Sequence, residues 1–220
     1  MKETVVCLVS GGIDSPVACV LASRMFKVVP LHFCIYPFTC EENFFIAMTG
    51  FKKLKERIGF EKVVVFPWGN ILEKILKERK GGYSCLVCRK SMFKAAEMVC
   101  EREGASGIVT GESLGQKASQ TLSNLGATTR GIKFPIIRPL LGLDKNEIEE
   151  ISKGARIWQE RHAGCCYATP KYPRTRAKAE IVDKIVEELG VPGMILENLG
   201  RIMEVKTFEE DFEGYLLSLA

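Results

Sequence analysis

Short apolar runs alternate with amphipathic segments along most of the chain. Runs rich in Val, Ile and Phe predict strands, because β-branched and aromatic residues suit a pleated, buried surface. Apolar residues that recur every three or four positions among lysines and glutamates predict helices. The expected strands span residues 4–9, 28–35, 62–68, 107–110 and 134–137. The expected helices span residues 16–25, 40–58, 71–79, 87–103 and 144–152.

The expected strands are apolar on both faces, which is typical of a parallel sheet covered by helices on each side. We therefore predict an α/β fold with a twisted parallel sheet. One apolar stripe predicts a helix near the C-terminus: Ile181, Val182, Ile185, Val186 and Leu189. We expect residues 195–208 to continue as a further helical segment. The expected organisation is an α/β domain over residues 1–170 and a helical extension over residues 171–220 that packs on it.

Composition narrows the class of protein. The 220 residues are 46% hydrophobic, and no apolar run approaches the roughly 20 residues that span a bilayer. The N-terminus lacks the pattern of a signal peptide, so we expect a cytoplasmic protein with no membrane partner. A net charge of +4 permits an anionic partner without demanding one. Nine cysteines without a secretion signal argue against a disulfide framework, which leaves buried thiols, metal ligands or catalysis.

The first expected strand ends in the sequence SGGIDSP at residues 10–16. Two glycines let the backbone curl, so that its N–H groups and the following helix N-terminus point at one concavity suited to phosphate. Asp14 lies beside this concavity and is suited to the Mg²⁺ that accompanies nucleotide phosphates. The loop has neither a Walker ending nor a GxGxxG fingerprint. An ordinary Gly-Gly turn is the alternative, but the strand before it and Pro16 after it favour a phosphate loop.

This strand, loop and helix resemble the PP-loop of the ATP pyrophosphatases, enzymes that cleave ATP between the α and β phosphates to form an adenylated intermediate. Two further stretches narrow the resemblance: TGESLGQKASQTL at residues 110–122, and RPLLGLD at residues 138–144 with Cys166 and Pro173 following. In this order they resemble the PP-loop domain of the ThiI-type tRNA 4-thiouridine sulfurtransferases over nearly the whole chain. The resemblance implies a Rossmann-like fold of the adenine nucleotide alpha hydrolase type.

The resemblance also implies an ATP site. The implied residues are Leu8, Val9, Ser10, Gly11, Gly12, Asp14, Ser15, His32, Phe33, Arg89, Gly111 and Gln120. His32, Phe33 and Gly111 lie at or near the carboxyl ends of expected strands, where open parallel sheets bind ligands. Arg89 would supply a fixed positive charge for phosphate. The structural alternatives are a core histidine for His32, a solvated helix face for Arg89 and a surface position for Gln120.

Two cysteines in the sequence CCYATP at residues 165–170 are candidates for sulfur chemistry. The resemblance implies that Cys166 is the sulfur-handling cysteine of the family. Lys171, Arg174 and Arg176 follow it, and nearby cations favour a thiolate that acts as a nucleophile or accepts persulfide sulfur. Cys165 is the alternative for the same role.

Cys85 and Cys88 form a CxxC pair, and two thiols at this spacing can share a metal or cluster, or act as a redox pair. Some PP-loop tRNA thiolation enzymes hold a [4Fe–4S] cluster on three cysteines beside the ATP site, and this sequence resembles them in having a CxxC and a later cysteine. We favour a cluster on Cys85, Cys88 and Cys166. Zinc, a redox dithiol and unligated structural thiols remain open. Three other cysteines lie in apolar patterns and are expected in the core: Cys7, Cys19 and Cys100.

The resemblance implies that an acceptor oxygen attacks the α phosphate of ATP and releases pyrophosphate, with Asp14-bound Mg²⁺ and Arg89 stabilising charge on the phosphates. Sulfur then displaces AMP. A tRNA uridine is the expected acceptor, and a cysteine desulfurase or free sulfide is the expected sulfur donor. The alternatives are a PP-loop ligase or synthase acting on a small molecule, including sulfur transfer in thiamine thiazole synthesis, and a non-catalytic Fe–S or zinc module.

The sequence departs from the resembling enzymes at both ends. We expect neither an RNA-binding module ahead of the first strand nor a rhodanese-like sulfur carrier after the last helix. Docking of tRNA is then expected to rely on a separate RNA-binding protein or on basic clusters of this domain, at residues 52–55, 74–80 and 171–178. The oligomeric state is open, with a homodimer as one candidate.

Overall fold

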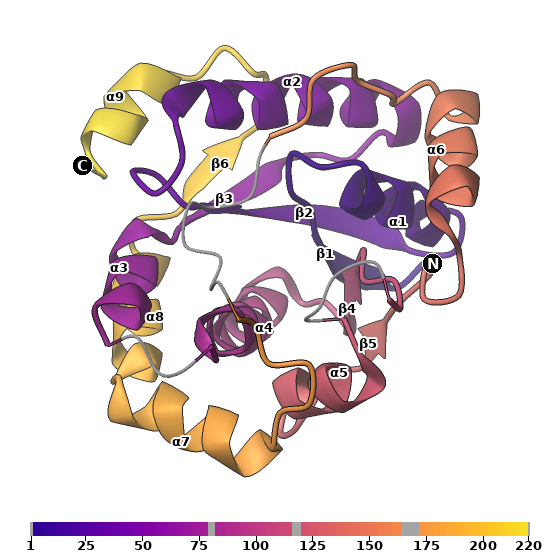
Figure 1. The fold of residues 1–220 in the computed structure, drawn as a ribbon. Helices are drawn as coiled ribbons and strands as arrows, with labels where there is room; N and C mark the ends of the chain where they lie inside the picture. Colours follow the sequence, from indigo (N-terminus) through magenta and orange to yellow (C-terminus); the bar gives the residue numbers. More distant parts are fainter. Residues whose placement is uncertain (1, 79–81, 116–119, 164–171, 220) are drawn as a thin grey trace.

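A mostly parallel sheet forms the centre of the structure, a computed structural model that describes residues 2–78, 82–115, 120–163 and 172–219. Within these residues the strand order is β5-β4-β1-β2-β3-β6 (Figure 1). The strands are β1 (Thr4–Leu8), β2 (Lys27–Cys34), β3 (Val63–Pro67), β4 (Gly107–Thr110), β5 (Ile136–Ile137) and β6 (Met203–Val205). The first five pair in parallel, and β6 pairs antiparallel with β3.

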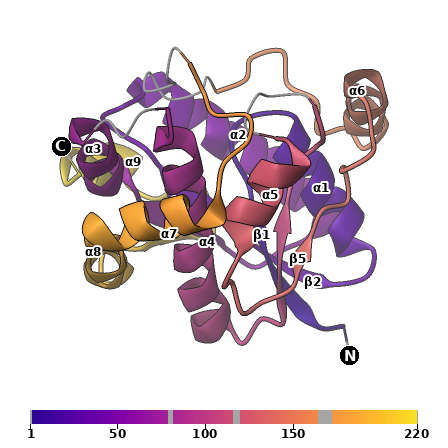
Figure 2. The ribbon, with the colours of Figure 1, turned by 60° about the horizontal axis from the view of Figure 1, so that its bottom comes forward.

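Helices cover both faces of the sheet, as the apolar runs predict (Figures 1 and 2). One face is covered by α1 (Asp14–Ser23), α2 (Glu41–Ile58), α6 (Lys145–Gly154) and α9 (Phe212–Leu217). The other is covered by α3 (Gly69–Lys77), α4 (Ser84–Glu103), α5 (Leu122–Thr129), α7 (Ala179–Glu188) and α8 (Val191–Leu199). Successive residues of β1 alternate between the two cores, with Val5 and Cys7 in one and Val6 in the other. The predicted α/β class is therefore confirmed.

Local signals explain several helix ends. Asp144 and Glu147 form the expected capping box: Asp144 Oδ1 accepts from Glu147 N at 2.9 Å, and Glu147 Oε2 accepts from Asp144 N at 2.7 Å. This box satisfies two N–H groups at the start of α6. Helix α4 begins at Ser84, earlier than the predicted residue 87, so that Cys85 and Cys88 lie in its first turns.

The prediction of a continuous helix over residues 195–208 is wrong. Helix α8 ends at Leu199, and Met203–Val205 forms β6, which pairs with the edge of β3. Helix α5 was not predicted at all. Its Thr121 cap accepts a hydrogen bond from Asn124 N at 3.2 Å, but its sequence, LSNLGATT, contains a glycine and few strong helix formers. Tertiary packing rather than local propensity decides both segments.

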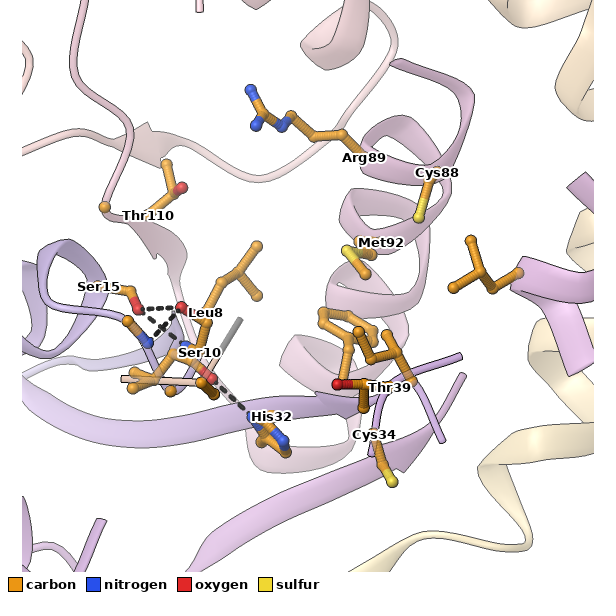
Figure 3. A pocket seen from close by; sticks show the side chains of 18 of the residues that line it. Leu8, Ser10, Ser15, His32, Cys34, Thr39, Cys88, Arg89, Met92 and Thr110 are labelled. Carbon is orange, nitrogen blue, oxygen red and sulfur yellow. Dashed lines mark hydrogen bonds between the residues drawn. The ribbon is translucent and has the colours of Figure 1, made fainter. Parts of the chain in front are cut away.

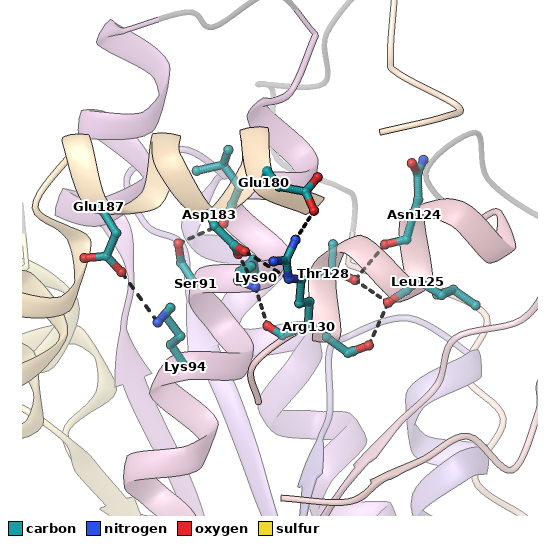
Figure 4. A network of polar contacts seen from close by, with 12 residues as sticks. Lys90, Ser91, Lys94, Asn124, Leu125, Thr128, Arg130, Glu180, Asp183 and Glu187 are labelled. Carbon is teal, nitrogen blue, oxygen red and sulfur yellow. Dashed lines mark hydrogen bonds and ion pairs between the residues drawn. The ribbon is translucent and has the colours of Figure 1, made fainter. Parts of the chain in front are cut away.

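Helix α7 packs against α4, whereas α8 contacts both α4 and β3. Helix α7 contacts α4 and α5, and a polar network joins the three (Figures 2 and 4). Lys90, only 2% exposed, pairs with the Asp183 carboxylate and donates to the Arg130 carbonyl at 2.5 Å. Arg130 also pairs with Glu180. Buried charges need such partners, so the network fixes one face of α4 while its other face meets the cavity described below.

No helix in the described part of the chain combines the length and apolar character that crossing a membrane requires.

Candidate nucleotide-binding site

A cavity of about 420 Å³ lies at the carboxyl ends of β1, β2 and β4 (Figure 3). This size suits a small-molecule ligand, and this edge is where open parallel sheets bind ligands. Ser10, Ser15 and Thr110 lie on one side, while Cys88 and Met92 of α4 lie on the other. The cavity brings together every implied ATP-site residue: Leu8, Val9, Ser10, Gly11, Gly12, Asp14, Ser15, His32, Phe33, Arg89, Gly111 and Gln120.

The loop after β1 is closed by its own serines. Ser10 N donates to Ser15 Oγ at 2.8 Å, and the two serine hydroxyls lie 3.0 Å apart. Gly12 N donates to Ser10 Oγ at 3.3 Å. A Cβ on Gly11 would lie 2.4 Å from the Ala163 Cβ, so only glycine fits there without movement. The loop thus curls over the N-terminus of α1, an arrangement suited to an anion.

Asp14 begins α1 and is one of the residues that line the cavity. Lys145 Nζ donates to Asp14 Oδ1 at 2.7 Å. Sequence reasoning missed Lys145. The sequence did contain a signal for it. A lysine in the first turn of a helix interacts unfavourably with the helix dipole, so an acidic partner is expected.

His32 is both a buried histidine and a cavity residue. Its Nδ1 lies 3.1 Å from the Val9 carbonyl oxygen, which can only accept, so Nδ1 carries the proton. The rings of Phe44 and Phe51 lie 6.0 and 5.5 Å from its own. Burial lowers the pKa of His32 to about 4. The imidazole is therefore neutral near pH 7, with Nε2 as a hydrogen-bond acceptor.

Arg89 lies against a buried carboxylate that the sequence reasoning missed. Arg89 Nη1 donates to Glu112 Oε1 at 2.9 Å, and Arg138 Nε donates to Glu112 Oε2 at 2.8 Å. Glu112 is 4% exposed and lines the cavity. Its signal in the sequence was an acidic residue two positions after the end of the expected strand at Thr110. Arg89 is thus a partly buried, paired guanidinium rather than a solvated helix residue.

Gln120 lies in the interior rather than on the surface. It is 7% exposed, and its Oε1 has no hydrogen-bond partner among the described residues. Because a buried acceptor without a partner costs free energy, this oxygen is suited to a ligand donor in the cavity.

Among the described residues, three cysteines line the cavity. They are Cys34 at the end of β2, where burial raises the pKa of the thiol to about 11, and Cys85 and Cys88 on α4. The buried Trp68 donates from Nε1 to Cys88 Sγ at 3.3 Å. Cys7, Cys19 and Cys100 are buried in the core, as predicted.

The two remaining candidates, Cys165 and Cys166, lie outside the described residues. Within residues 2–78, 82–115, 120–163 and 172–219, no three His, Cys, Asp or Glu side chains are placed to hold a metal. Ala163 N donates to the Gly11 carbonyl at 3.0 Å, and Arg174 N donates to the Gly82 carbonyl at 3.3 Å. The described residues on either side of the two cysteines therefore contact the glycine loop and the approach to α4.

The parallel sheet and the SGGIDS loop at its carboxyl edge define a PP-loop protein. The chain belongs to the ThiI family, because the family model described as Thiamine biosynthesis protein (ThiI) matches residues 1–191.

Curated relatives carry names that agree with this family. The chain is 40% identical over 198 residues to a probable tRNA sulfurtransferase from Methanothermobacter thermautotrophicus, covering 88% of this chain and 51% of the relative. It is 38% identical over 197 residues to a probable tRNA sulfurtransferase from Methanocaldococcus jannaschii, covering 84% and 49%. The chain therefore spans about half the length of these relatives.

Solved structures support the same fold. A 4-thiouridine synthetase in complex with RNA and bound ATP is similar with a TM-score of 0.82 and 30% identity, over 93% of this chain and 55% of that one. The U34-tRNA thiolase NcsA from Methanococcus maripaludis, with its [4Fe-4S] cluster, matches with a TM-score of 0.57 and 18% identity, over 99% and 73%. The second likeness concerns the fold alone.

Proposed function

We propose that this chain binds ATP in the cavity, adenylates a uridine of tRNA with release of pyrophosphate, and supports the replacement of the uridine oxygen by sulfur. The observation that carries the proposal is the serine-closed glycine loop at the N-terminus of α1, in a chain of the ThiI family. The names of the relatives and the 4-thiouridine synthetase complex with RNA and ATP support the acceptor and the nucleotide.

Each wall of the cavity has a proposed task. The glycine loop at residues 10–15 binds the β and γ phosphates at the N-terminus of α1, and Arg89 adds positive charge. Leu8, Val9, His32, Phe33, Gly111 and Gln120 contact the nucleoside, and the neutral Nε2 of His32 and Oε1 of Gln120 suit its N–H and O–H donors. The Asp14 carboxylate fits Mg²⁺, which prefers one or two carboxylates with phosphate oxygens, and Mg²⁺ would neutralise charge on the phosphates.

The reaction has two displacement steps. A uracil carbonyl oxygen attacks the α phosphorus, and the bond to the β-phosphate oxygen breaks, so that pyrophosphate leaves. Sulfur then attacks the adenylated carbon, and AMP leaves with the former carbonyl oxygen. Sulfide reacts without any redox change. With a persulfide, the terminal sulfur bonds to the carbon, a second thiol then attacks the inner sulfur and breaks the S–S bond, and an external thiol reduces the disulfide that forms. Cys166 is our candidate for the persulfide, with Cys165 as its alternative.

The CxxC pair is the part of the site that fits a [4Fe–4S] cluster. Cys85 and Cys88 both line the cavity from the first turns of α4, and thiolates are the usual ligands of such clusters. We propose Cys166 as the third ligand, with zinc as the less favoured occupant. When bound, a cluster with an open iron would hold sulfide near the nucleotide. Iron and acid-labile sulfide assays on anaerobically purified protein test this, and the absence of both would reject the cluster.

Three further features belong to the same proposal. A cysteine desulfurase or free sulfide supplies sulfur, and tRNA is recruited by this chain or by a separate RNA-binding protein in the cytoplasm. Residues 1–170 act as the nucleotide-binding domain, and residues 171–220 act as a helical extension of it. Size-exclusion chromatography with light scattering tests whether the protein is a homodimer.

The decisive experiment measures release of pyrophosphate and AMP from ATP with unmodified tRNA, with and without sulfide, and detects 4-thiouridine by mass spectrometry. We expect pyrophosphate release to require tRNA, and thionucleoside formation to require sulfide as well. Asp14→Asn is expected to abolish both. The description of the family model favours a second function, sulfur transfer in thiamine thiazole synthesis. Turnover only with a small-molecule acceptor would support that function, and no turnover with any acceptor would support a non-catalytic metal module.

A further inference from the structure

Two arginines share one buried carboxylate beside the cavity. Glu112 accepts from Arg89 Nη1 at 2.9 Å through Oε1 and from Arg138 Nε at 2.8 Å through Oε2. Glu112 and Arg89 line the cavity, whereas Arg138 is not among the described residues that line it. Arg138 therefore contacts the wall of the cavity through Glu112.

The three groups carry a net charge of +1. The side chains of Glu112, Arg138 and Arg89 are 5%, 16% and 24% exposed, so water screens their interactions weakly. The Arg138 Nη2 is buried and has no acceptor in the described part of the chain, so Glu112 is its counter-charge there. Because both arginines pair with the same carboxylate, each one leaves less of its negative charge to neutralise the other arginine.

The carboxylate has little freedom to move. Ser113 Oγ donates to the Leu143 carbonyl at 2.9 Å, and Leu114 N donates to the Leu141 carbonyl at 3.2 Å. On the other side, a Cβ on Gly111 would lie 2.6 Å from Ser15 Cα, so the chain before Glu112 packs on the backbone of α1. The position of Glu112 is therefore fixed from both sides.

We propose that Glu112 is a positioning residue that holds Arg89 against the phosphate site, and that Arg138 sets, through Glu112, how much positive charge Arg89 offers to a phosphate. This inference rests on the proposed function, because it assumes that an anionic nucleotide occupies the cavity. It gives a role to Arg138 in nucleotide affinity that requires no contact between Arg138 and the nucleotide.

Two substitutions test the proposal, because they should change pyrophosphate affinity in opposite directions. Glu112→Gln removes the shared negative charge, so affinity for inorganic pyrophosphate should rise about threefold to tenfold, while kcat falls because Arg89 loses its anchor. Arg138→Gln leaves the whole carboxylate to Arg89, so pyrophosphate affinity should fall by a similar factor. Arg138→Lys keeps the charge and should restore most of the affinity. Isothermal titration calorimetry with pyrophosphate and with ATP measures the affinities. Steady-state pyrophosphate release measures kcat.

Matched controls lie at the opposite edge of the sheet. Glu61→Gln and Arg102→Gln make the same charge changes at the amino end of β3 and the C-terminal turn of α4, and should leave pyrophosphate affinity within twofold of wild type. If Glu112→Gln fails to fold, the two Arg138 variants still test the proposal. Lower pyrophosphate affinity in Arg138→Gln together with recovery in Arg138→Lys supports it, and unchanged affinity in Arg138→Gln overturns it.

The failures of the two proposals look different. If wild-type protein binds neither ATP nor pyrophosphate, the proposed function is rejected, and this inference with it. If wild type binds both, but Glu112→Gln and Arg138→Gln weaken binding in the same direction, the shared carboxylate is merely structural. That result overturns the present inference and leaves the proposed function intact.

Discussion

Lys145 Nζ lies 2.7 Å from Asp14 Oδ1, and this contact joins the first residue of α6 to the first residue of α1. The side chains are 46% and 25% exposed, respectively. Ion pairs this accessible typically contribute less than about 1 kcal/mol to stability. The main consequence of the pair is therefore at the cavity, where the ammonium holds the Asp14 carboxylate beside the glycine loop.

Lys145→Met should lower activity while leaving stability nearly unchanged. We expect pyrophosphate release to fall at least about tenfold, which corresponds to about 1.4 kcal/mol of lost transition-state stabilisation, while Tm changes by less than about 4 °C. Lys184→Met is the matched control, because it removes a 75%-exposed partner of Glu188 on α7 and should change neither quantity. Equal losses of activity in the two variants, or a Tm shift large enough to explain the loss, would contradict the prediction.

Gly111→Ala should disrupt the joint between β4 and α1. The new Cβ would lie 2.6 Å from Ser15 Cα and 2.7 Å from Ser15 N, and backbone atoms cannot yield as a side chain can. We expect a loss of about 1–3 kcal/mol in the free energy of unfolding and at least about a tenfold loss of ATP affinity as α1 shifts. Urea unfolding and equilibrium dialysis measure these effects.

Gly126→Ala is the control for that substitution, because Gly126 lies within α5 with open space around its Cβ position. A helix-interior alanine should stabilise the protein by up to about 1 kcal/mol and leave ATP affinity unchanged. If Gly111→Ala behaved like Gly126→Ala, close contact between β4 and α1 would not matter for nucleotide binding.

His32 should make stability depend on pH. Burial lowers its pKa from 6.5 to about 4, so between these values the unfolded chain binds a proton that the folded protein does not. Stability from this group is complete above pH 6.5 and falls as pH decreases towards 4, by about 2 kcal/mol between pH 7 and pH 5. His32→Asn keeps a donor for the Val9 carbonyl but does not titrate. Urea unfolding should show the stability difference between wild type and variant shrinking from pH 7 to pH 5, and a constant difference would exclude the effect.

The fold class and five of the strand positions were predictable because buried parallel strands are continuous apolar runs. The runs at residues 4–9 and 62–68, for example, contain β1 and β3 within one or two residues of their ends. Strand β6 was not predictable from its own sequence. Three residues carry no periodicity, and their conformation depends on the pairing of Val205 with Val63.

The parts of the site that are formed by residues adjacent in the sequence were predictable. The contacts between residues far apart in the sequence were not. The loop at residues 10–15 is one local turn, so its shape follows from two glycines and the helix after it. Lys145 contacts Asp14 across 131 positions, and Arg138 contacts Glu112 across 26. A local pattern can indicate that such a residue needs a partner, but it does not identify the partner, because the pairs depend on how β4 and α6 approach α1.

Residues 172–178 carry exposed basic side chains on a segment that is hydrogen-bonded to α5. Asn124 fastens this segment to α5: its Nδ2 donates to the Arg174 carbonyl at 2.8 Å, and Ala177 N donates to its Oδ1 at 2.9 Å. Thr121 Oγ1 donates to the Thr175 carbonyl at 2.7 Å, next to the cavity residue Gln120. Arg176 and Lys178 are exposed on the fastened segment. Exposed arginines and lysines bind phosphates, so we expect this segment to contact the backbone of a tRNA whose base enters the cavity.

The double variant Arg176→Gln/Lys178→Gln should therefore weaken tRNA binding and reduce its salt dependence. Each phosphate contact contributes about 0.7–0.9 to the slope of log K against log salt concentration, so the slope should fall by about 1.4–1.8. ATP affinity should not change, because neither residue lines the cavity. The control is Arg24→Gln/Arg57→Gln, two exposed arginines at the C-terminal ends of α1 and α2. Filter binding at several salt concentrations measures these slopes. Equal slopes of log K against log salt concentration for the two double variants would show that the RNA-binding surface lies elsewhere.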